Sequence, residues 1–323
     1  MTEPEKAWEH YWQSPRLASC GGEGERQYQP AIVEHWHRVF AGFRSPPAIL
    51  DLCCGNGALA IMACRFFSGG ASGTPAIDAV DRARIDPVRW LDRHAEWVRR
   101  IRFRNGVSAE SLPFPDGHFT AVISQYGIEY TDTRGALQEC RRVLAPRGHL
   151  AFLCHAREGV TTAQATRQQT EIEALLTLDY FPLADRLLQA ELGLIGTTET
   201  ERARLNASFA TLNRILRERQ AVSVEPKMYE SVGGVVRDTL SRIGQFPPAT
   251  LRNKIAEVAR TVEDHAQRTR ELIRAARTDS EIRDWLSPLT AQDFRAVGPL
   301  PHPVHGPSGL LGWAVVLERM QGS

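Results

Sequence analysis

The sequence lacks the features that would assign it to a membrane or to a nucleic acid. No uninterrupted apolar run approaches the length that crosses a bilayer, and the opening stretch, MTEPEKAWEHYWQ, is charged rather than signal-like. Thirty-nine Lys and Arg against 38 Asp and Glu leave a formal net charge of +1, so no overall field attracts polyanions. We therefore expect a cytoplasmic protein whose partner is a small molecule, with neither nucleic acid nor membrane as a partner.

The sequence also lacks a cysteine pattern typical of structural metal sites. None of its six cysteines forms a C-x-x-C pair, and Cys53 and Cys54 are neighbours in a loop. Cys154 ends an apolar run, which favours a buried, reduced thiol over a nucleophile. His302 and His305 lie in a Pro-rich turn without an acidic partner at ligand spacing. We predict no metal site.

Short apolar runs recur between residues 48 and 155 and alternate with helical stretches. The runs are AILDL, AIDAV, the weaker IRFRNG, FTAVIS and HLAFLC. Such alternation predicts an α/β fold with a doubly wound, mostly parallel sheet, covered by helices on both faces. With 323 residues, 42% of them hydrophobic, the chain is long enough for one large domain or two ordinary ones.

The segments outside this core have a different composition. We predict an N-terminal helical cap over 1–47, which contains Trp8, Tyr11, Trp12 and a CGGEGE loop, and a Rossmann-like core over 48–160. Residues 161–288 show a 3.6-residue apolar period and predict an all-helical insertion of four or five helices. Residues 289–323 form a turn-rich stretch that leads into a final strand near 311–317, which completes the sheet.

The loop in ILDLCCGNGALA predicts a nucleotide-like ligand. Gly55, Gly57 and Ala60 follow an apolar strand and open a helix, with the spacing of a dinucleotide fingerprint. Asp51 ends that strand, where a carboxylate would repel a pyrophosphate and attract an ammonium and a sulfonium. The alternative is that Asp51 only braces the loop by accepting backbone N–H bonds. The charge argument favours S-adenosylmethionine over a nicotinamide dinucleotide.

The next strand ends in a second carboxylate. Asp81, followed by Arg82, lies where a carboxylate can accept both hydroxyls of a ribose. Asp78 is the alternative, although it falls inside the strand. A surface charge without a ligand is the other interpretation.

Further along, the stretches VSAESLPFPDGHFTAVISQYGIEY and ALQECRRVLAPRGHLAFL resemble the class I S-adenosylmethionine-dependent methyltransferases. The resemblance covers about 48–155 and implies S-adenosylmethionine as the cofactor. It also implies that Ala109 and Glu110 meet the adenine, with the glutamate accepting from the exocyclic amine. The family loop is commonly Asp-x-Gly-x-Gly-x-Gly, and here Cys53 stands in place of its first glycine. This small substitution should still admit the ligand.

Residues after the fourth and fifth strands should face the transferred group, because ligands bind at the carboxyl ends of parallel strands. Gln125 is a cofactor-binding candidate, and Tyr126 could orient an acceptor or serve only as a pocket wall. His155 could act as a general base if the acceptor loses a proton, or be a structural histidine. Arg26 and Tyr28 could close over the methionine carboxylate or simply belong to a solvated loop.

These inferences favour an enzyme that methylates a small-molecule acceptor. The helical insertion would then be a lid over the acceptor, or else a structural or homodimerising bundle. One alternative keeps the cofactor but not methylation: cyclisation or alkyl transfer that releases methylthioadenosine. Another is a non-catalytic module that only binds the cofactor.

Overall fold

The computed structural model describes residues 3–19, 28–44, 47–69, 74–223 and 226–321. The chain divides into two compact units. One consists of Met1–Gln164 with Glu271–Ser323, and the other is Ala165–Arg270. The second unit is shorter at both ends than the 161–288 insertion that the sequence predicts.

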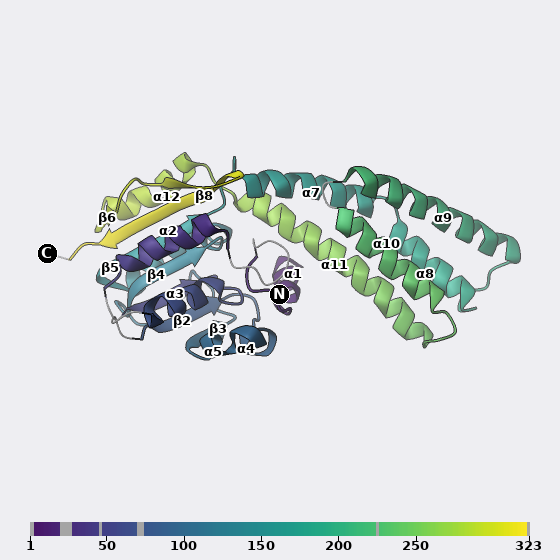
Figure 1. The fold of residues 1–323 in the computed structure, drawn as a ribbon, viewed down its shortest axis with the longest axis horizontal. Helices are drawn as coiled ribbons and strands as arrows, with labels where there is room; N and C mark the ends of the chain where they lie inside the picture. Colours follow the sequence, from purple (N-terminus) through teal and green to yellow (C-terminus); the bar gives the residue numbers. More distant parts are fainter. Residues whose placement is uncertain (1–2, 20–27, 45–46, 70–73, 224–225, 322–323) are drawn as a thin grey trace. The chain divides into compact units, whose positions relative to one another are not determined.

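The first unit, called the core unit below, is built on one sheet with eight strands among the described residues (Figure 1). The order is β3-β2-β1-β4-β5-β8-β6, and β7 pairs with β8. The first five strands in this order run parallel, whereas β8 runs antiparallel to β5. This topology confirms the predicted doubly wound, mostly parallel sheet. The strands are β1 (Ala48–Leu52), β2 (Ala76–Asp81), β3 (Ile101–Asn105), β4 (Phe119–Gln125), β5 (Leu144–Cys154), β6 (Phe294–Ala296), β7 (His302–Gly306) and β8 (Gly309–Arg319).

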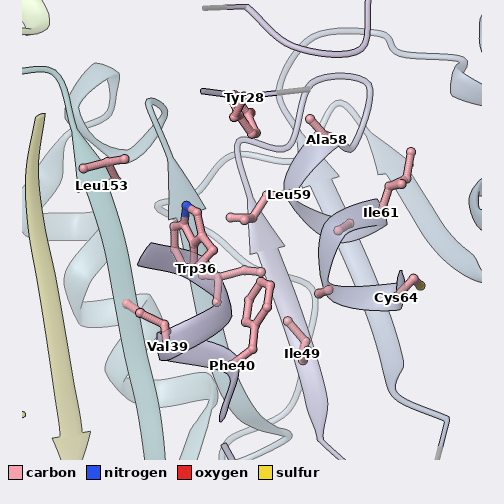
Figure 2. Packing of buried hydrophobic residues seen from close by; sticks show 14 of the residues in the cluster. Tyr28, Trp36, Val39, Phe40, Ile49, Ala58, Leu59, Ile61, Cys64 and Leu153 are labelled. Atoms are coloured by element: carbon pink, nitrogen blue, oxygen red, sulfur yellow. The ribbon is translucent and has the colours of Figure 1, made fainter. Parts of the chain in front are cut away.

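Helices cover both faces of the sheet because successive strand residues point to opposite sides. Ile49 packs in one apolar cluster with α2 (Pro30–Ala41) and α3 (Ala58–Ser68). Its neighbour Leu50 packs in a second cluster with α6 (Thr133–Val143) and α12 (Asp279–Thr290). Figure 2 shows Trp36 and Phe40 of α2 in the first cluster. The remaining helices of the core unit are α1 (Glu3–Trp12), α4 (Pro87–Trp90), α5 (Ala95–Val98) and the 3₁₀ turns Asp92–His94 and Ile128–Tyr130.

The region from 160 to 290 contains six helices in its described residues, rather than the four or five predicted. The break that the sequence placed at Pro182 lies just before this proline, between the end of α7 at Leu176 and the start of α8 at Tyr180; Pro182 is in the first turn of α8, where a missing N–H costs nothing. The additional helix is α12, which a Thr278–Glu281 capping box separates from α11. The others are α7 (Val160–Leu176), α8 (Tyr180–Glu191), α9 (Glu199–Val222), α10 (Pro226–Ser241) and α11 (Pro248–Ala275).

The second unit has an apolar core of its own. Residues between Ile172 and Ala266 form one buried cluster that shares no member with the two clusters on the sheet. Across the described helices of the whole chain, none is both long enough and apolar enough to cross a membrane.

The insertion leaves and re-enters the core unit at a single point. Ala156 and Arg277 form an isolated parallel bridge, in which Arg277 N donates to His155 O and Arg157 N donates to Arg277 O, both at 2.9 Å. Helix α7 begins four residues after Ala156, and α11 ends two residues before Arg277. The two ends of the helical segment are therefore held side by side.

The turn-rich stretch before the last strand contains more sheet than predicted. His302–Gly306 forms β7, so His302 and His305 lie on a strand rather than in a turn. The prolines of this stretch are typical of turns, so the sequence did not predict a strand here. They are tolerated here because β7 pairs only with β8 and is an edge strand. The described residues contain no group of three or more His, Cys, Asp or Glu side chains that could hold a metal ion.

Candidate active site

The loop after β1 has the backbone conformation that its glycines predict. Cys53, Gly55 and Gly57 have φ values of 57°, 52° and 82°, all in the left-handed region. A Cβ on Gly55 would collide with the ring of Trp12, and one on Gly57 would lie 2.6 Å from the ring of Phe103. Cys53, which replaces the family's first glycine, thus keeps a glycine-like conformation. Burial raises the pKa of its thiol well above the usual value, so the thiol stays protonated.

Asp51 lies beneath this loop. It is 1% exposed, and its Oδ2 accepts a hydrogen bond from Ala60 N at 3.0 Å, in the first turn of α3. Burial raises the pKa of Asp51 to about 8. Asp51 is also absent from the residues that line the cavity described next. In this structure it has the bracing geometry that the sequence left as an alternative.

A cavity of about 560 Å³ opens at the carboxyl ends of β1, β2 and β4. This volume is in the range of small-molecule sites. It brings together most of the predicted site residues, whereas Gly55, Gly57 and His155 do not line it. The predicted residues that line it are Cys53, Asp81, Arg82, Ala109, Glu110, Gln125 and Tyr126.

Asp81 is held by the backbone at the mouth of the glycine loop. Its Oδ2 accepts from Gly55 N at 2.7 Å and its Oδ1 from Ala83 N at 2.8 Å. Each carboxylate oxygen can accept a second hydrogen bond, so a pair of ribose hydroxyls fits the remaining capacity. Asp78, the alternative, is instead engaged by Arg102, whose Nη2 lies 2.6 Å from its Oδ2. Burial raises the pKa of Asp81, against the effect of its backbone donors.

Glu110 lies in the loop after β3, the edge strand that pairs with β2. Its Oε1 accepts from Asp132 N at 2.8 Å, and its Oε2 accepts from the hydroxyl of Ser108. Burial alone would raise the pKa of Glu110, but these hydrogen bonds lower it. The side chain is therefore a fixed, ionised acceptor next to Ala109, as an adenine amine would require.

Gln125 presents an unused hydrogen-bond donor. Its Oε1 accepts from the indole N–H of Trp36, which fixes the orientation of the amide. Its Nε2 is buried and has no hydrogen-bond partner among the described residues. An orphaned buried donor is costly, so it indicates a missing acceptor. Together with the Gly55 backbone and Asp81, it fits S-adenosylmethionine, which carries a carboxylate and a ribose.

Tyr126 lines the cavity, and His155 lies against its ring on the side away from the cavity. Their rings stack with centroids 4.1 Å apart, and the Tyr126 hydroxyl donates to Leu311 O at 3.1 Å. Tyr126 has a φ of 52°, a strained value of a kind that often occurs at functional sites. His155 is 1% exposed and contacts the carboxyl of Glu129, with Nδ1 and Oε1 2.9 Å apart.

Aromatic residues of the N-terminal segment complete the cavity. Trp8 and Trp12 line it and stack with centroids 6.3 Å apart. Trp8 Nε1 donates to Glu271 Oε2 at 2.6 Å. Tyr28 also lines the cavity, whereas Arg26 lies outside the described residues. The cap that the sequence predicted thus contributes rings to the site.

Sequence reasoning missed a second group of lining residues. Glu129 and Tyr130 follow β4 by a few residues. About 140 positions further along, Arg274 lies in the last turn of α11 and Arg277 lies two residues after this helix. The acidic residue in QYGIEY was a visible signal for Glu129. No sequence pattern signals that the end of α11 returns to the site.

Gly127 and Cys53 are expected to be energetically coupled. A Cβ on Gly127 would lie 2.5 Å from the Cβ of Cys53. We expect Gly127→Ala to lower the free energy of unfolding by about 1–3 kcal/mol, as overpacking does. Adding Cys53→Gly should restore at least half of the loss. Urea unfolding of the four proteins, followed by tryptophan fluorescence, measures this, and strictly additive effects would contradict the assigned contact.

Comparison with known proteins places the core in a family. Residues 49–148 match the family model described as "Methyltransferase domain". The chain is 37% identical over 115 residues to a demethylmenaquinone methyltransferase of Thermus thermophilus, covering 34% of this chain and 48% of that protein. It is 31% identical over 157 residues to a 2-phytyl-1,4-naphtoquinone methyltransferase of Trichormus variabilis, covering 46% and 62%.

Among solved structures, an S-adenosylmethionine-dependent methyltransferase from Mesorhizobium loti is similar, with 18% identity and a TM-score of 0.29. That match covers 38% of this chain and 53% of the other. The chain spans about half the length of the first curated relative, and the matched segment is the part that carries the glycine loop, Asp81 and Glu110. Residues 49–148 therefore form a methyltransferase domain, and this is the part of the chain that resembles the class I S-adenosylmethionine-dependent methyltransferases.

Proposed function

We propose that this protein transfers a methyl group from S-adenosylmethionine to a small aromatic acceptor that carries a hydroxyl group. The observation that carries the proposal is that one cavity is lined by Asp81, Glu110 and Gln125, whose Nε2 has no partner among the described residues. Asp81 suits the ribose hydroxyls, Glu110 suits the adenine amine, and the N–H group of Gln125 suits the carboxylate of S-adenosylmethionine. The methyl-bearing end of such a ligand would then lie near Tyr126.

When bound, S-adenosylmethionine supplies a methyl group on a positively charged sulfur. The residues of the chain then have to hold the acceptor in line and exclude water, which in well-oriented cases corresponds to effective molarities of about 10⁵ M or more. The rings of Trp8, Tyr126 and Tyr130, all in the cavity wall, provide flat apolar surfaces for this. We assign Tyr126 to acceptor orientation and His155 to the support of the proton-accepting group.

The acceptor class rests on the relatives and on these aromatic walls. The two curated relatives are named for methylation of quinone-type compounds, a demethylmenaquinone and a phytyl-naphthoquinone. Trp8 and Tyr130 lie edge to face in the cavity wall with centroids 5.7 Å apart, and such aromatic walls favour an aromatic acceptor. We therefore propose a hydroxylated aromatic ring of the quinol type as the acceptor class.

The cofactor assignment has a direct test. S-adenosylhomocysteine should raise the melting temperature of the core unit by several degrees, because a ligand at 100 times its Kd stabilises the folded state by about 2.7 kcal/mol. NAD⁺ should have no such effect, since Gly55 N, a loop donor that a pyrophosphate would need, already donates to Asp81. Stabilisation by NAD⁺ without stabilisation by S-adenosylhomocysteine would contradict the proposed function.

A further inference from the structure

We infer that Glu129 takes the proton of the acceptor's hydroxyl and that His155 is the residue that positions it. This inference rests on the proposed function, because it concerns the acceptor side of the same cavity. Glu129 lies in the 3₁₀ turn Ile128–Tyr130, directly after β4, and it lines the cavity. The sequence offered His155 and Tyr126 as the candidates for acceptor chemistry.

One oxygen of Glu129 is fully engaged. Oε1 lies 2.9 Å from the backbone N of His155 and 2.9 Å from its ring Nδ1. With an ionised carboxylate, Nδ1 must carry the hydrogen and donate it. The His155 ring is itself held by stacking on Tyr126 and by an edge-to-face contact with Tyr130, with ring centroids 6.1 Å apart. His155 therefore fixes the orientation of the carboxyl group and does not line the cavity.

The other oxygen has no hydrogen-bond partner. Oε2 of Glu129 is buried, and the described residues offer it none. The Cys154 thiol is a neighbouring group that can donate to this carboxyl, and its pKa is raised by burial, by the Glu129 charge and by a hydrogen bond with Glu129. A thiol is only a weak donor. A buried carboxylate oxygen without a partner is costly, so a purely bracing role would leave that cost unexplained.

The charges around the carboxyl favour a hydroxyl over an ammonium as the missing partner. Arg277 Nη2 donates to the backbone O of Glu129 at 3.3 Å, and Arg274 lines the same cavity. Two guanidinium groups would repel a cationic acceptor, whereas they would stabilise the negative charge that develops on a hydroxyl oxygen as it loses its proton.

The step is balanced in atoms and charge. The O–H bond of the acceptor breaks, its proton moves to Oε2 of Glu129, and the electron pair stays on the acceptor, on oxygen or on a conjugated ring carbon. That pair forms the new bond to the methyl group, while the methyl–sulfur bond breaks and its electrons remain on sulfur as a neutral thioether. The proton on Glu129 is then released to solvent, and the carboxylate is regenerated.

The test compares two naphthalenes that differ at one oxygen, which carries the proton at issue in 2-naphthol and a methyl group in 2-methoxynaphthalene. In the presence of saturating S-adenosylhomocysteine, calorimetry should show that the wild type binds 2-naphthol at least about tenfold more tightly than 2-methoxynaphthalene. In Glu129→Gln this ratio should fall to about 1–3, because a neutral amide cannot accept a charge-assisted hydrogen bond. S-adenosylhomocysteine affinity should stay within about threefold of wild type in every variant, since no cofactor contact is assigned to Glu129.

Two His155 variants separate positioning from packing. His155→Asn keeps an N–H donor toward Oε1 and should retain the naphthol preference, whereas His155→Phe keeps the ring but removes the donor and should lose it. Glu96→Gln, a change of the same type at an exposed position, is the matched control and should leave all affinities unchanged. Retention of the preference in His155→Phe would overturn the positioning role.

The wild-type ratio alone decides the main point, even if a variant does not fold. Equal binding of 2-naphthol and its methyl ether, while S-adenosylhomocysteine binds, would overturn the role of Glu129 and leave the proposed function standing. Tighter binding of 2-naphthylmethylamine, which is cationic at neutral pH, than of 2-naphthol would overturn the hydroxyl acceptor. Failure of S-adenosylhomocysteine to bind the wild type would instead contradict the proposed function itself.

Discussion

Asp81→Ala is expected to weaken S-adenosylhomocysteine binding by at least about tenfold, because charge-assisted hydrogen bonds contribute about 1.5–3 kcal/mol each. Both carboxylate oxygens are already oriented by Gly55 N and Ala83 N, so the site is arranged before a ligand binds. The substitution removes the ribose acceptors, and it also releases the backbone of the glycine loop. Calorimetry measures the combined loss.

The two contributions can be separated with a second ligand. A 2′,3′-dideoxy analogue of S-adenosylhomocysteine lacks the hydroxyls, so it should bind the wild type weakly and lose little more in Asp81→Ala. Asp92→Ala removes the same charge at an exposed position of the same unit and is the matched control. Unchanged S-adenosylhomocysteine affinity in a folded Asp81→Ala protein would refute the ribose assignment. A loss of equal size for both ligands would assign Asp81 to loop support alone.

Much of the fold follows from local patterns in the sequence. The five runs predicted β1 to β5 because each is short and bounded by polar turns, and all but the weaker IRFRNG of β3 are rich in apolar residues. The glycine loop was predictable from its spacing. The structure gives the steric reason for that spacing, because Gly55 and Gly57 lie where a Cβ would meet an aromatic ring. Strand β7 was not predictable, since its prolines are tolerated only because of its edge position, which is a tertiary property.

The residues of the site also fall into two groups: those that the sequence identifies and those that only the tertiary structure reveals. Asp81 and Gln125 were found because they end strands whose carboxyl ends meet at one edge, whereas Glu110 was found through the resemblance to the methyltransferase family. The burial of Asp51 was not predictable: the sequence assigned it a negative charge toward the ligand, whereas burial raises its pKa to about 8. Nor does any local pattern show that Arg274 and Arg277 reach the cavity, because that depends on the Ala156–Arg277 bridge.

The helical segment offers the other prediction with a large expected effect. We propose that Ala165–Arg270 acts as a lid for the acceptor, because the chain enters it just after β5, at the carboxyl edge where the cavity opens. Replacing Ala165–Arg270 with a short Gly/Ser linker removes this unit but keeps Glu271, Arg274 and Arg277. A larger deletion, of 161–288, would also remove the α12 residues that pack on the sheet.

The shortened protein should fold. The apolar cluster of the second unit shares no residue with those of the core unit, and the Ala156–Arg277 bridge holds the ends of the insertion together, so a short linker suffices. All seven tryptophans lie outside Ala165–Arg270, so their fluorescence reports the core unit alone in both proteins. We expect the same urea midpoint and S-adenosylhomocysteine affinity within about threefold of the full chain.

Turnover should behave differently from binding. With an acceptor that the full chain methylates, the shortened protein should release S-adenosylhomocysteine at least about a hundredfold more slowly, because an exposed site loses orientation of the acceptor and exclusion of water. Sedimentation of the same two samples tests the alternative, in which the helical unit serves dimerisation. A dimeric full chain and a monomeric shortened protein with equal turnover would assign the unit to dimerisation. Full turnover in the shortened protein, whatever its oligomeric state, would show that the acceptor pocket is complete in the core unit and that the helical unit is not a lid.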